Sequence, residues 1–259
     1  MQTMILAAGL GTRLKPLTDI IPKALVPVAD KPLLQRVLDL VASYPEDRVV
    51  INTHHHASQI KNFVDITRGH WPAEILISDE TDSLLDTGGG LRRARHLFSP
   101  SEPILIHNVD ILSDTPLRTL YASGHGHDAT LLVSRRQTSR YLILDDDMRL
   151  WGWTNILTRE IRSPHKELMS LSGREIAHDF LSPETHTPLH LYAFSGIHTF
   201  SPSLFPVMDT WPERFPIIDF YLSACATHDI RGTLSVDLHL LDVGKLDTLA
   251  SADAFVSSL

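Results

Sequence analysis

The chain opens with a short apolar run that leads directly into a loop of glycines, one hydroxyl and one arginine. Residues 4–13 read MILAAGLGTR, and Lys23 follows ten residues after Arg13. Glycines let backbone N–H groups close on phosphate oxygens, and the two cations add positive charge. The segment therefore predicts a β-strand whose carboxyl end carries a phosphate-binding loop.

Two familiar phosphate-binding motifs do not fit this loop. The dinucleotide-binding fingerprint requires a third glycine, but the chain has Leu14 after the two residues that follow Gly11. The P-loop requires Gly-Lys-Ser/Thr after four variable residues, and the loop has no such lysine. The segment is therefore either a different kind of phosphate-binding loop or a glycine-rich turn with a surface arginine.

The residues from Gly9 to Val28 follow one continuous pattern, Gly-x-Gly-Thr-Arg-(x)2-Pro-Leu-Thr-(x)3-Pro-Lys-(x)3-Pro-Val. This pattern resembles that of the sugar-1-phosphate nucleotidyltransferases, the nucleotide-sugar pyrophosphorylases. The resemblance covers the whole chain, densely to about Asp110 and sparsely afterwards. It implies an α/β protein with a doubly wound, mostly parallel (mixed) sheet of the nucleotide-diphospho-sugar transferase, Rossmann-like fold.

The first half of the chain alternates short β-branched runs with helical periodicity, which is typical of a parallel sheet with crossover helices. We expect strands at 4–8, 48–52, 74–78 and 103–107. We expect helices at 32–41, 57–67 and 88–98.

The second half is less regular, and residues 154–182 are too polar for an assignment. Strands are expected at 129–133, 141–144 and 189–194, and helices at 203–208, 217–227 and from 246. No Gly/Ser linker, charge run or internal repeat marks a boundary. We therefore expect one domain over 1–259, with a nucleotide-binding half (1–112), a sugar-binding half (113–259) and no left-handed β-helix domain.

Composition limits the classes of partner. A net charge of −8 argues against a nucleic-acid binder, which would normally show a basic face. No run of 18 apolar residues predicts a membrane span, and the chain begins with a strand rather than a signal peptide. The single cysteine, Cys225, lies in an apolar stretch and is expected to be a buried thiol. Together these features favour a cytoplasmic protein, a monomer or small homo-oligomer.

Two aspartates each follow an apolar run. Asp110 ends the fourth expected strand, and in doubly wound sheets the ligand crevice lies outside the carboxyl ends of the strands. Magnesium takes one or two protein carboxylates together with phosphate oxygens. The alternative is an aspartate that closes an Asx turn. Asp242 ends a later apolar run, and Gly244 permits a tight turn beside it.

The resemblance strengthens the interpretation of both aspartates. Residues 108–110 resemble the metal-binding Asn/Gly-x-Asp segment of the family, and residues 242–244 resemble its Asp-x-Gly segment. The resemblance thus implies that Asp110 and Asp242 hold Mg²⁺. Lys245 stands where the family usually has a small residue, which leaves its role open.

The segment Thr87-Gly88-Gly89-Gly90 resembles the one that lies along the nucleotide base in these enzymes. Glycines let a base approach the backbone, whose N–H and C=O groups then read its edge. The alternative is a helix start with Thr87 as N-cap, and both can hold together. The triple glycine more specifically resembles the N-acetylmuramate-1-phosphate uridylyltransferases and the bacterial mannose- or heptose-1-phosphate guanylyltransferases.

The sugar side is less clearly marked. Ser195-Gly196 resembles the strand segment beside the sugar phosphate. Where other members place a sugar-contacting Glu and often a Lys, this chain has Trp151 to Asn155. Asn155 could bind a hydroxyl and Trp153 could stack on a ring, although core packing of both tryptophans is the stronger alternative.

The resemblance implies that a sugar-1-phosphate oxygen attacks the α-phosphorus of a nucleoside triphosphate, with UTP or GTP favoured. The products are pyrophosphate and a nucleotide sugar of the kind used for cell-envelope polysaccharide. The implied catalytic residues are Arg13, Lys23 and Asp110. The implied nucleotide-binding residues are Leu6, Ala8, Gly9, Gly11, Thr12, Arg13, Thr87, Gly88 and Asn108. The implied substrate-binding residues are Lys23, Asn155, Ser195 and Gly196.

Two other functions share this N-terminal loop or fold. One is a cytidylyltransferase for phosphocholine or another phospho-alcohol. The other is a non-catalytic nucleotide-sugar sensor. Sensors typically lose a cation or a metal ligand, whereas Arg13, Lys23, Asp110 and Asp242 are all present. A substrate panel separates the three functions.

Overall fold

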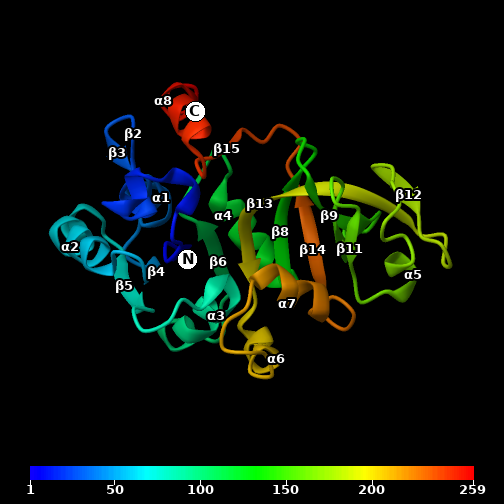
Figure 1. Ribbon diagram of the computed structural model, residues 1–259. Helices are drawn as coiled ribbons and strands as arrows, with labels where there is room; N and C mark the ends of the chain where they lie inside the picture. The colour runs from blue at the N-terminus through cyan, green and yellow to red at the C-terminus, as the bar shows by residue number, and fades with distance from the viewer.

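The computed structural model describes residues 1–259, and one mixed sheet of 11 strands runs through it (Figure 1). The strand order is β11-β10-β9-β13-β6-β1-β4-β5, with β8 and β12 also paired to β13 and β14 paired to β8. These strands are β1 (Gln2–Leu6), β4 (Arg48–Thr53), β5 (Glu74–Asp79), β6 (Ile104–Asn108), β8 (Ala129–Ser134), β9 (Arg140–Asp145), β10 (Leu150–Asn155), β11 (Glu160–Arg162), β12 (Asp179–Leu181), β13 (Pro188–Phe200) and β14 (Ile230–Leu234).

The N-terminal part of the sheet is parallel, as expected. β1 pairs with β4 and β6, and β4 pairs with β5, all in parallel. The crossover helices are α1 (Leu33–Val41), α2 (Ala57–Thr67) and α3 (Asp86–Ala94). Because parallel strands share a direction, the residues that follow β1, β4, β5 and β6 meet at one edge of the sheet.

The long strand β13 joins this parallel part to the second half of the chain. It runs antiparallel to β9 at one end and to β6 at the other, and β8 pairs along it. Its pairing with β8 shifts register between Phe194 and His198. Gly196, with φ +78°, lies in this bulge and has the left-handed backbone that glycine adopts without strain.

The remaining elements are short. Two small antiparallel pairs form between β2 (Pro27–Val28) and β3 (Lys31–Pro32), and between β7 (Ile111–Ser113) and β15 (Leu240–Asp242). The other α-helices are α4 (Leu117–Ser123), α5 (Lys166–Met169), α6 (Phe205–Met208), α7 (Ile217–Ala224) and α8 (Leu246–Val256). Single 3₁₀ turns occupy Thr12–Leu14, Leu17–Asp19, Lys23–Leu25, Arg68–His70, Arg95–Leu97, Gly124–Gly126 and Pro202–Leu204.

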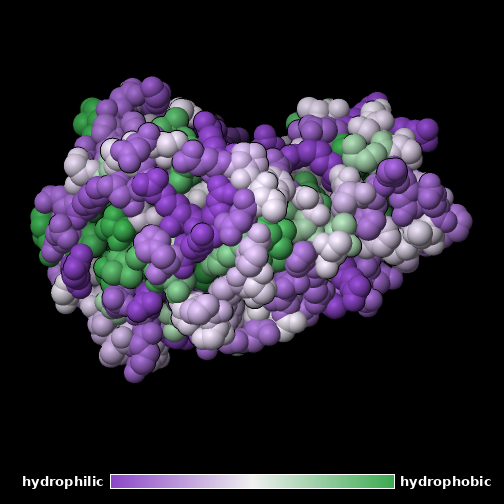
Figure 2. All heavy atoms as spheres, turned by 90° about the horizontal axis from the view of Figure 1, so that it is seen from below, coloured by the Kyte–Doolittle hydropathy of each residue, from purple (hydrophilic) through white to green (hydrophobic).

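Hydrophobic cores lie on both faces of the sheet. Successive residues of β1 point to opposite faces, so Ile5 joins the cluster packed by α1 and α2 while Met4 joins the one packed by α3 and α7. The sheet is thus covered on both faces, as a doubly wound fold requires. Figure 2 shows the molecule from below, with a mostly polar surface interrupted by apolar patches. No helix combines the length and the apolar character that a membrane span requires.

Several expected boundaries were wrong. The first strand ends at Leu6 rather than Ala8, because the N–H of Ala7 donates to the side chain of Asn52 instead of a neighbouring strand. The third crossover helix begins at Asp86 and continues as a 3₁₀ turn after Ala94. The segment left unassigned, 154–182, holds β11, α5 and β12. The division of the domain at residue 112 stays a prediction.

Candidate active site

The loop after β1 has the shape that its two glycines allow. Gly11 adopts φ +64°, and a Cβ there would lie 2.8 Å from the Thr18 methyl carbon. Thr18 Oγ1 also donates to the Gly11 carbonyl at 2.9 Å, which fixes the turn. A Cβ at Gly9 would meet nothing within 4 Å. Gly11 thus shapes the loop, while Gly9 leaves open space beside it.

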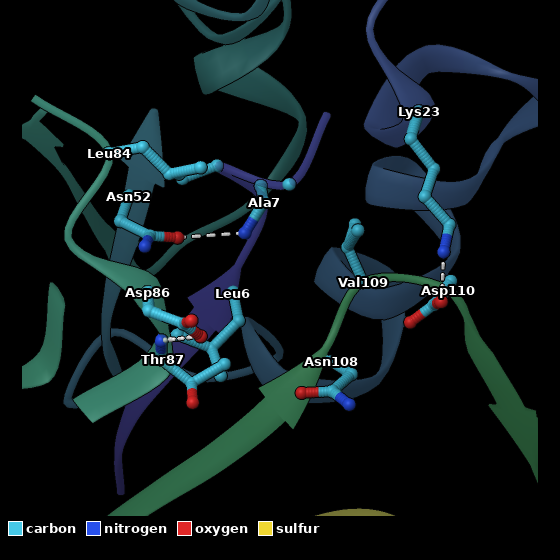
Figure 3. A pocket seen from close by; sticks show the side chains of 12 residues that line it. Leu6, Ala7, Lys23, Asn52, Leu84, Asp86, Thr87, Asn108, Val109 and Asp110 are labelled. Carbon is cyan, nitrogen blue, oxygen red and sulfur yellow. Dashed lines mark hydrogen bonds and ion pairs between the residues drawn. The ribbon is translucent and has the colours of Figure 1, made fainter. Parts of the chain in front are cut away.

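A cavity of about 240 Å³ lies against this loop, and we call it the loop pocket. It gathers residues that follow four parallel strands, and Figure 3 shows how their side chains line it. The lining residues are Leu6, Ala7, Ala8, Gly9, Lys23, Asn52, Leu84, Asp86, Thr87, Asn108, Val109 and Asp110. Seven of these residues were predicted from the sequence, and five were not: Ala7, Asn52, Leu84, Asp86 and Val109.

Lys23 and Asp110 form an ion pair at one side of the loop pocket (Figure 3). Their side chains are only 12% and 14% exposed. Lys23 begins a 3₁₀ turn, and Asp110 follows the end of β6. The pair places a cation and a carboxylate 87 residues apart in sequence at the end of the loop pocket.

Asp242 lies beside Asp110. The N–H of Val243 donates to the Asp110 carbonyl at 2.9 Å, and Asp242 itself pairs with Ile111 where β15 meets β7. Burial, followed by the negative charge of Asp110, raises the pKa of Asp242, while the charges of Lys23 and Arg13 oppose the shift. The two predicted metal-binding residues therefore meet, although 132 residues separate them.

Asp110 and Asp242 fit a magnesium site. Two adjacent carboxylates repel each other, and hard oxygen donors of this kind are the ligands that Mg²⁺ prefers. The structure contains no cluster of three or more His, Cys, Asp or Glu side chains suited to a metal. The other ligands of a magnesium ion at this position would be water and phosphate oxygens.

Arg13 lies near Asp242 and Gly244. A Cβ at Gly244 would come within 2.7 Å of Arg13 Nη2 and 2.6 Å of Asp242 Oδ1. The glycine therefore lets the guanidinium lie against the backbone beside this carboxylate. The Arg13 side chain is exposed, which leaves its donors open to a ligand.

A wider crevice of about 940 Å³, the wide crevice, begins at Arg13 and Asp242. Its wall is rich in cations and polar groups. The lining residues are Arg13, Arg136, Thr138, Ser139, Arg140, Tyr141, Leu142, Trp153, Asn155, Glu160, Arg162, Phe194, Pro216, Ile218, Asp219, Asp242, Lys245 and Thr248. Asn155, Trp153 and Lys245 lie on this wall, and their contact with a sugar stays a prediction.

The two tryptophans of β10 have different surroundings. Trp153 lines the wide crevice, and Arg162 lies 3.9 Å from the centre of its ring. Trp151 stacks on His165 and donates from Nε1 to Asp145 at 2.9 Å. Both tryptophans pack against a hydrophobic core, as expected, and Trp153 also lines the wide crevice.

The triple glycine is required by packing. The N–H groups of Gly88 and Gly89 both donate to the Phe215 carbonyl, and a Cβ at Gly88 would lie 2.3 Å from the Phe215 ring. Thr87 does not cap α3, whose N-cap is Leu85; its Oγ1 accepts from Ile217 N at 2.8 Å. The expectation of a Thr87 N-cap was wrong. The Gly88 N–H is also not free to read a base.

Neither Ser195 nor Gly196 lines the two cavities. Ser195 is buried and donates from Oγ to the Leu132 carbonyl at 2.8 Å. A Cβ at Gly196 would lie 2.7 Å from Asn108 Nδ2. These residues shape the β13 bulge around Asn108, and their contact with a substrate stays a prediction. Gly11 and Thr12 likewise lie outside both cavity walls.

A comparison with protein families is consistent with the geometry of this site. Residues 2–141 match the family model described as nucleotidyl transferase, which is more than half of the 259 residues. The chain therefore belongs to the nucleotidyl transferase family.

Curated relatives match part of the chain. It is 39% identical over 115 residues to the N-acetylmuramate alpha-1-phosphate uridylyltransferase of Caulobacter vibrioides, covering 41% of this chain and 44% of that protein. It is 32% identical over 152 residues to the mannose-1-phosphate guanylyltransferase catalytic subunit beta of Drosophila pseudoobscura pseudoobscura, covering 56% and 41%. Each alignment spans less than half of the relative.

Solved structures resemble the whole chain. HddC from Yersinia pseudotuberculosis, in a complex with GMP-PN, superposes with a TM-score of 0.72 at 18% identity, covering 98% of both chains. The inositol-1-phosphate CTP transferase from T. maritima gives a TM-score of 0.68 at 12% identity, covering 99% and 94%. These likenesses confirm the expected nucleotide-diphospho-sugar transferase fold.

Proposed function

We propose that this protein transfers a nucleotidyl group from a nucleoside triphosphate to a sugar-1-phosphate, releasing pyrophosphate. One observation carries the proposal: Lys23, Asp110, Asp242 and Arg13 converge where the loop pocket meets the wide crevice. Cations and a metal ion at the junction of two cavities would offset the negative charge of two phosphates that react there. The named relatives, a uridylyltransferase and a guanylyltransferase, support this chemistry.

The residues would act by positioning and by offsetting charge. The attacking sugar phosphate is already an anion, so no general base is needed. The loop after β1 and Arg13 would bind the β- and γ-phosphates, which leave together. Lys23 would exchange Asp110 for the α-phosphate or the incoming sugar phosphate. Asp110 and Asp242 would hold Mg²⁺, whose charge would offset the negative charge that builds up at the reacting phosphates.

The wide crevice would bind the sugar phosphate. Arg140 and Lys245 form no ion pair within the chain, so both cations can face an anionic substrate. Trp153 offers an apolar face and Asn155 an amide for hydroxyl groups. We propose UTP or GTP as the donor, and N-acetylmuramate-, mannose- or heptose-1-phosphate as the acceptor. We also propose that the protein is cytoplasmic and is a monomer or a small homo-oligomer. Light scattering measures the oligomeric state.

The test is a screen of five nucleoside triphosphates against sugar-1-phosphates and phosphocholine, with pyrophosphate release as the readout. The expected result is the highest kcat/KM for UTP or GTP with one of the three proposed sugars, since discrimination lies in that ratio. A clear preference for dTTP with glucose-1-phosphate would contradict this substrate assignment. Turnover of CTP with a phospho-alcohol would favour the cytidylyltransferase, and nucleotide binding without any turnover would favour the sensor.

A further inference from the structure

A buried chain of hydrogen bonds connects the two segments that form the loop pocket. Asn52 Oδ1 accepts from the Ala7 N–H at 2.7 Å, and Asn52 Nδ2 donates to Glu80 Oε1 at 2.7 Å (Figure 3 shows the first bond). Glu80 Oε2 then accepts from the Leu85 N–H at 3.4 Å. One end of this chain lies directly before the loop after β1, and the other lies at the turn into α3.

Packing and backbone contacts fix both polar side chains. Asn52 is 2% exposed and Glu80 is fully buried. The Glu80 N–H donates to the Thr53 carbonyl at 2.8 Å, and the Glu80 carbonyl contacts His54 Nδ1 at 2.7 Å. A Cβ at Gly90 would lie 2.5 Å from Glu80 Oε1 and 2.9 Å from Asn52 Nδ2. The third glycine of the triple-glycine segment thus makes room for this pair.

Each bond in the chain has a fixed direction. The N–H groups of Ala7 and Leu85 donate to the two ends of the hydrogen-bond chain. The two side chains between them must therefore supply an acceptor at each end and one donor in the middle. A carboxylate next to an amide meets this requirement. No cation forms an ion pair with Glu80, and burial raises the pKa of its carboxyl, because burying a charged group away from water is costly. If Glu80 and Asn52 served only to pack the core, apolar side chains would do so without the cost of burying a charge.

We propose that Glu80 and Asn52 are positioning residues for nucleotide binding. Their hydrogen-bond chain sets the spacing between the loop after β1 and the turn at Leu84–Thr87, which face each other across the loop pocket. Glu80 does not line that pocket, so it acts through Asn52 and Leu85. This inference rests on the proposed function, because it assigns the spacing to the binding of a nucleoside triphosphate.

The fixed directions allow a test by exchange. In Glu80→Gln, an amide NH₂ would face either the Asn52 amide or the Leu85 N–H, and one donor would lose its acceptor. In Asn52→Asp, two buried carboxylates would face each other. In the double variant Asn52→Asp with Glu80→Gln, the new carboxylate would accept from the Ala7 N–H and from the new side-chain amide. The oxygen of that amide would accept from the Leu85 N–H. This exchange restores all three bonds and the charge.

The measurements are the dissociation constants of UTP and GTP by calorimetry with magnesium, and KM for the sugar phosphate found in the screen. We expect each single variant to weaken nucleotide binding about tenfold or more, because a buried donor loses its acceptor or two charges repel. KM for the sugar phosphate should change little. The double variant should recover most of the lost affinity. Glu74→Gln, at the exposed start of the strand that Glu80 follows, is the matched control and should bind like the wild type.

The outcomes separate this inference from the proposed function. A wild-type chain that binds no nucleoside triphosphate would overturn both. A wild type that binds while Glu80→Gln binds equally well would overturn the inference alone. Thermal unfolding is followed in parallel, and a loss of stability without a loss of affinity would also overturn it. If a single variant fails to fold, the double variant provides the test. Nucleotide affinity near that of the wild type would support the role of the hydrogen-bond chain. Affinity as weak as that expected for a single variant would contradict it.

Discussion

Asp242 carries a charge that the folded chain tolerates at a cost. Burial and the neighbouring Asp110 raise its pKa, so its ionised form is less favourable in the folded than in the unfolded state. Asp110, by contrast, is paired with Lys23. A pair of neighbouring carboxylates, one of them with a raised pKa, is typical of a functional site.

Replacing Asp242 should therefore separate function from stability. Asp242→Asn removes one proposed metal-binding oxygen donor and should lower turnover by about 10²-fold or more. The free energy of unfolding should stay equal or rise, because the repulsion with Asp110 is relieved. Pyrophosphate release at saturating Mg²⁺ and urea unfolding measure the two effects. Asp237→Asn, at an exposed site, is the control, and normal turnover of Asp242→Asn would contradict its assignment as a metal-binding residue.

Arg13 offers a second test among single residues. Its side chain is exposed and forms no ion pair, so Arg13→Ala should leave stability unchanged. Loss of an oriented charge on a transferring phosphoryl group should lower turnover roughly 10²–10³-fold, by analogy with loss of one oxyanion donor. Arg13→Lys should restore only part of the rate, because the bidentate fork is lost. Steady-state kinetics on both variants check this, and a change in stability alone would contradict the phosphate-binding role.

Among the elements, α3 depends on close approach to the segment before α7. A Cβ at Gly89 would lie 2.4 Å from the Glu213 carbonyl oxygen, and backbone cannot move aside as a flexible side chain can. Gly89→Ala should lower the free energy of unfolding by about 1–3 kcal/mol. Gly69→Ala is the control, because its Cβ would meet nothing within 4 Å. Urea unfolding of both variants measures the difference, and equal stabilities would show that α3 can shift freely.

The elements also show how far local sequence predicts structure. The bounds of α2 agree with its periodicity, since its buried positions repeat every three to four residues. β13 was expected only over 189–194, because the bulge at Gly196 interrupts the alternation that marks a strand. The short β11 and β12 exist through pairing with β10 and β13. Such non-local bonds leave no periodic signal in a polar segment.

The residues of the candidate site also divide into those that the sequence predicts and those that it does not. Lys23, Asp110 and Asp242 could be found because each stands in a motif or at the end of an apolar strand. Asn52 follows the same strand-end rule and was missed, although β4 had been expected to end there. Arg136 and Arg140 come to the wide crevice from a loop and a strand start with no motif around them. Their position follows only from the folded sheet.

At the scale of the whole molecule, two buried histidines couple the central sheet to pH. His107 on β6 and His198 on β13 are almost fully buried, and burial lowers the pKa of His107 to about 4 and that of His198 to about 3. Both rings are therefore neutral in the folded chain at pH 5 and above. In the unfolded chain they take up a proton near pH 6.5.

These two histidines should make the fold less stable in acid. Below pH 6.5 the unfolded state binds protons that the folded state refuses, so stability falls as pH falls towards the folded pKa values. Each histidine should contribute a slope of about 1.4 kcal/mol per pH unit in this range. In His198→Leu the apolar side chain replaces two buried ring nitrogens that have no hydrogen-bond partner, so the fold should persist and lose one histidine's share of the slope. Urea unfolding at pH 7, 6 and 5 measures both slopes, and identical slopes would show that His198 takes up its proton at the same pH in the folded and the unfolded protein.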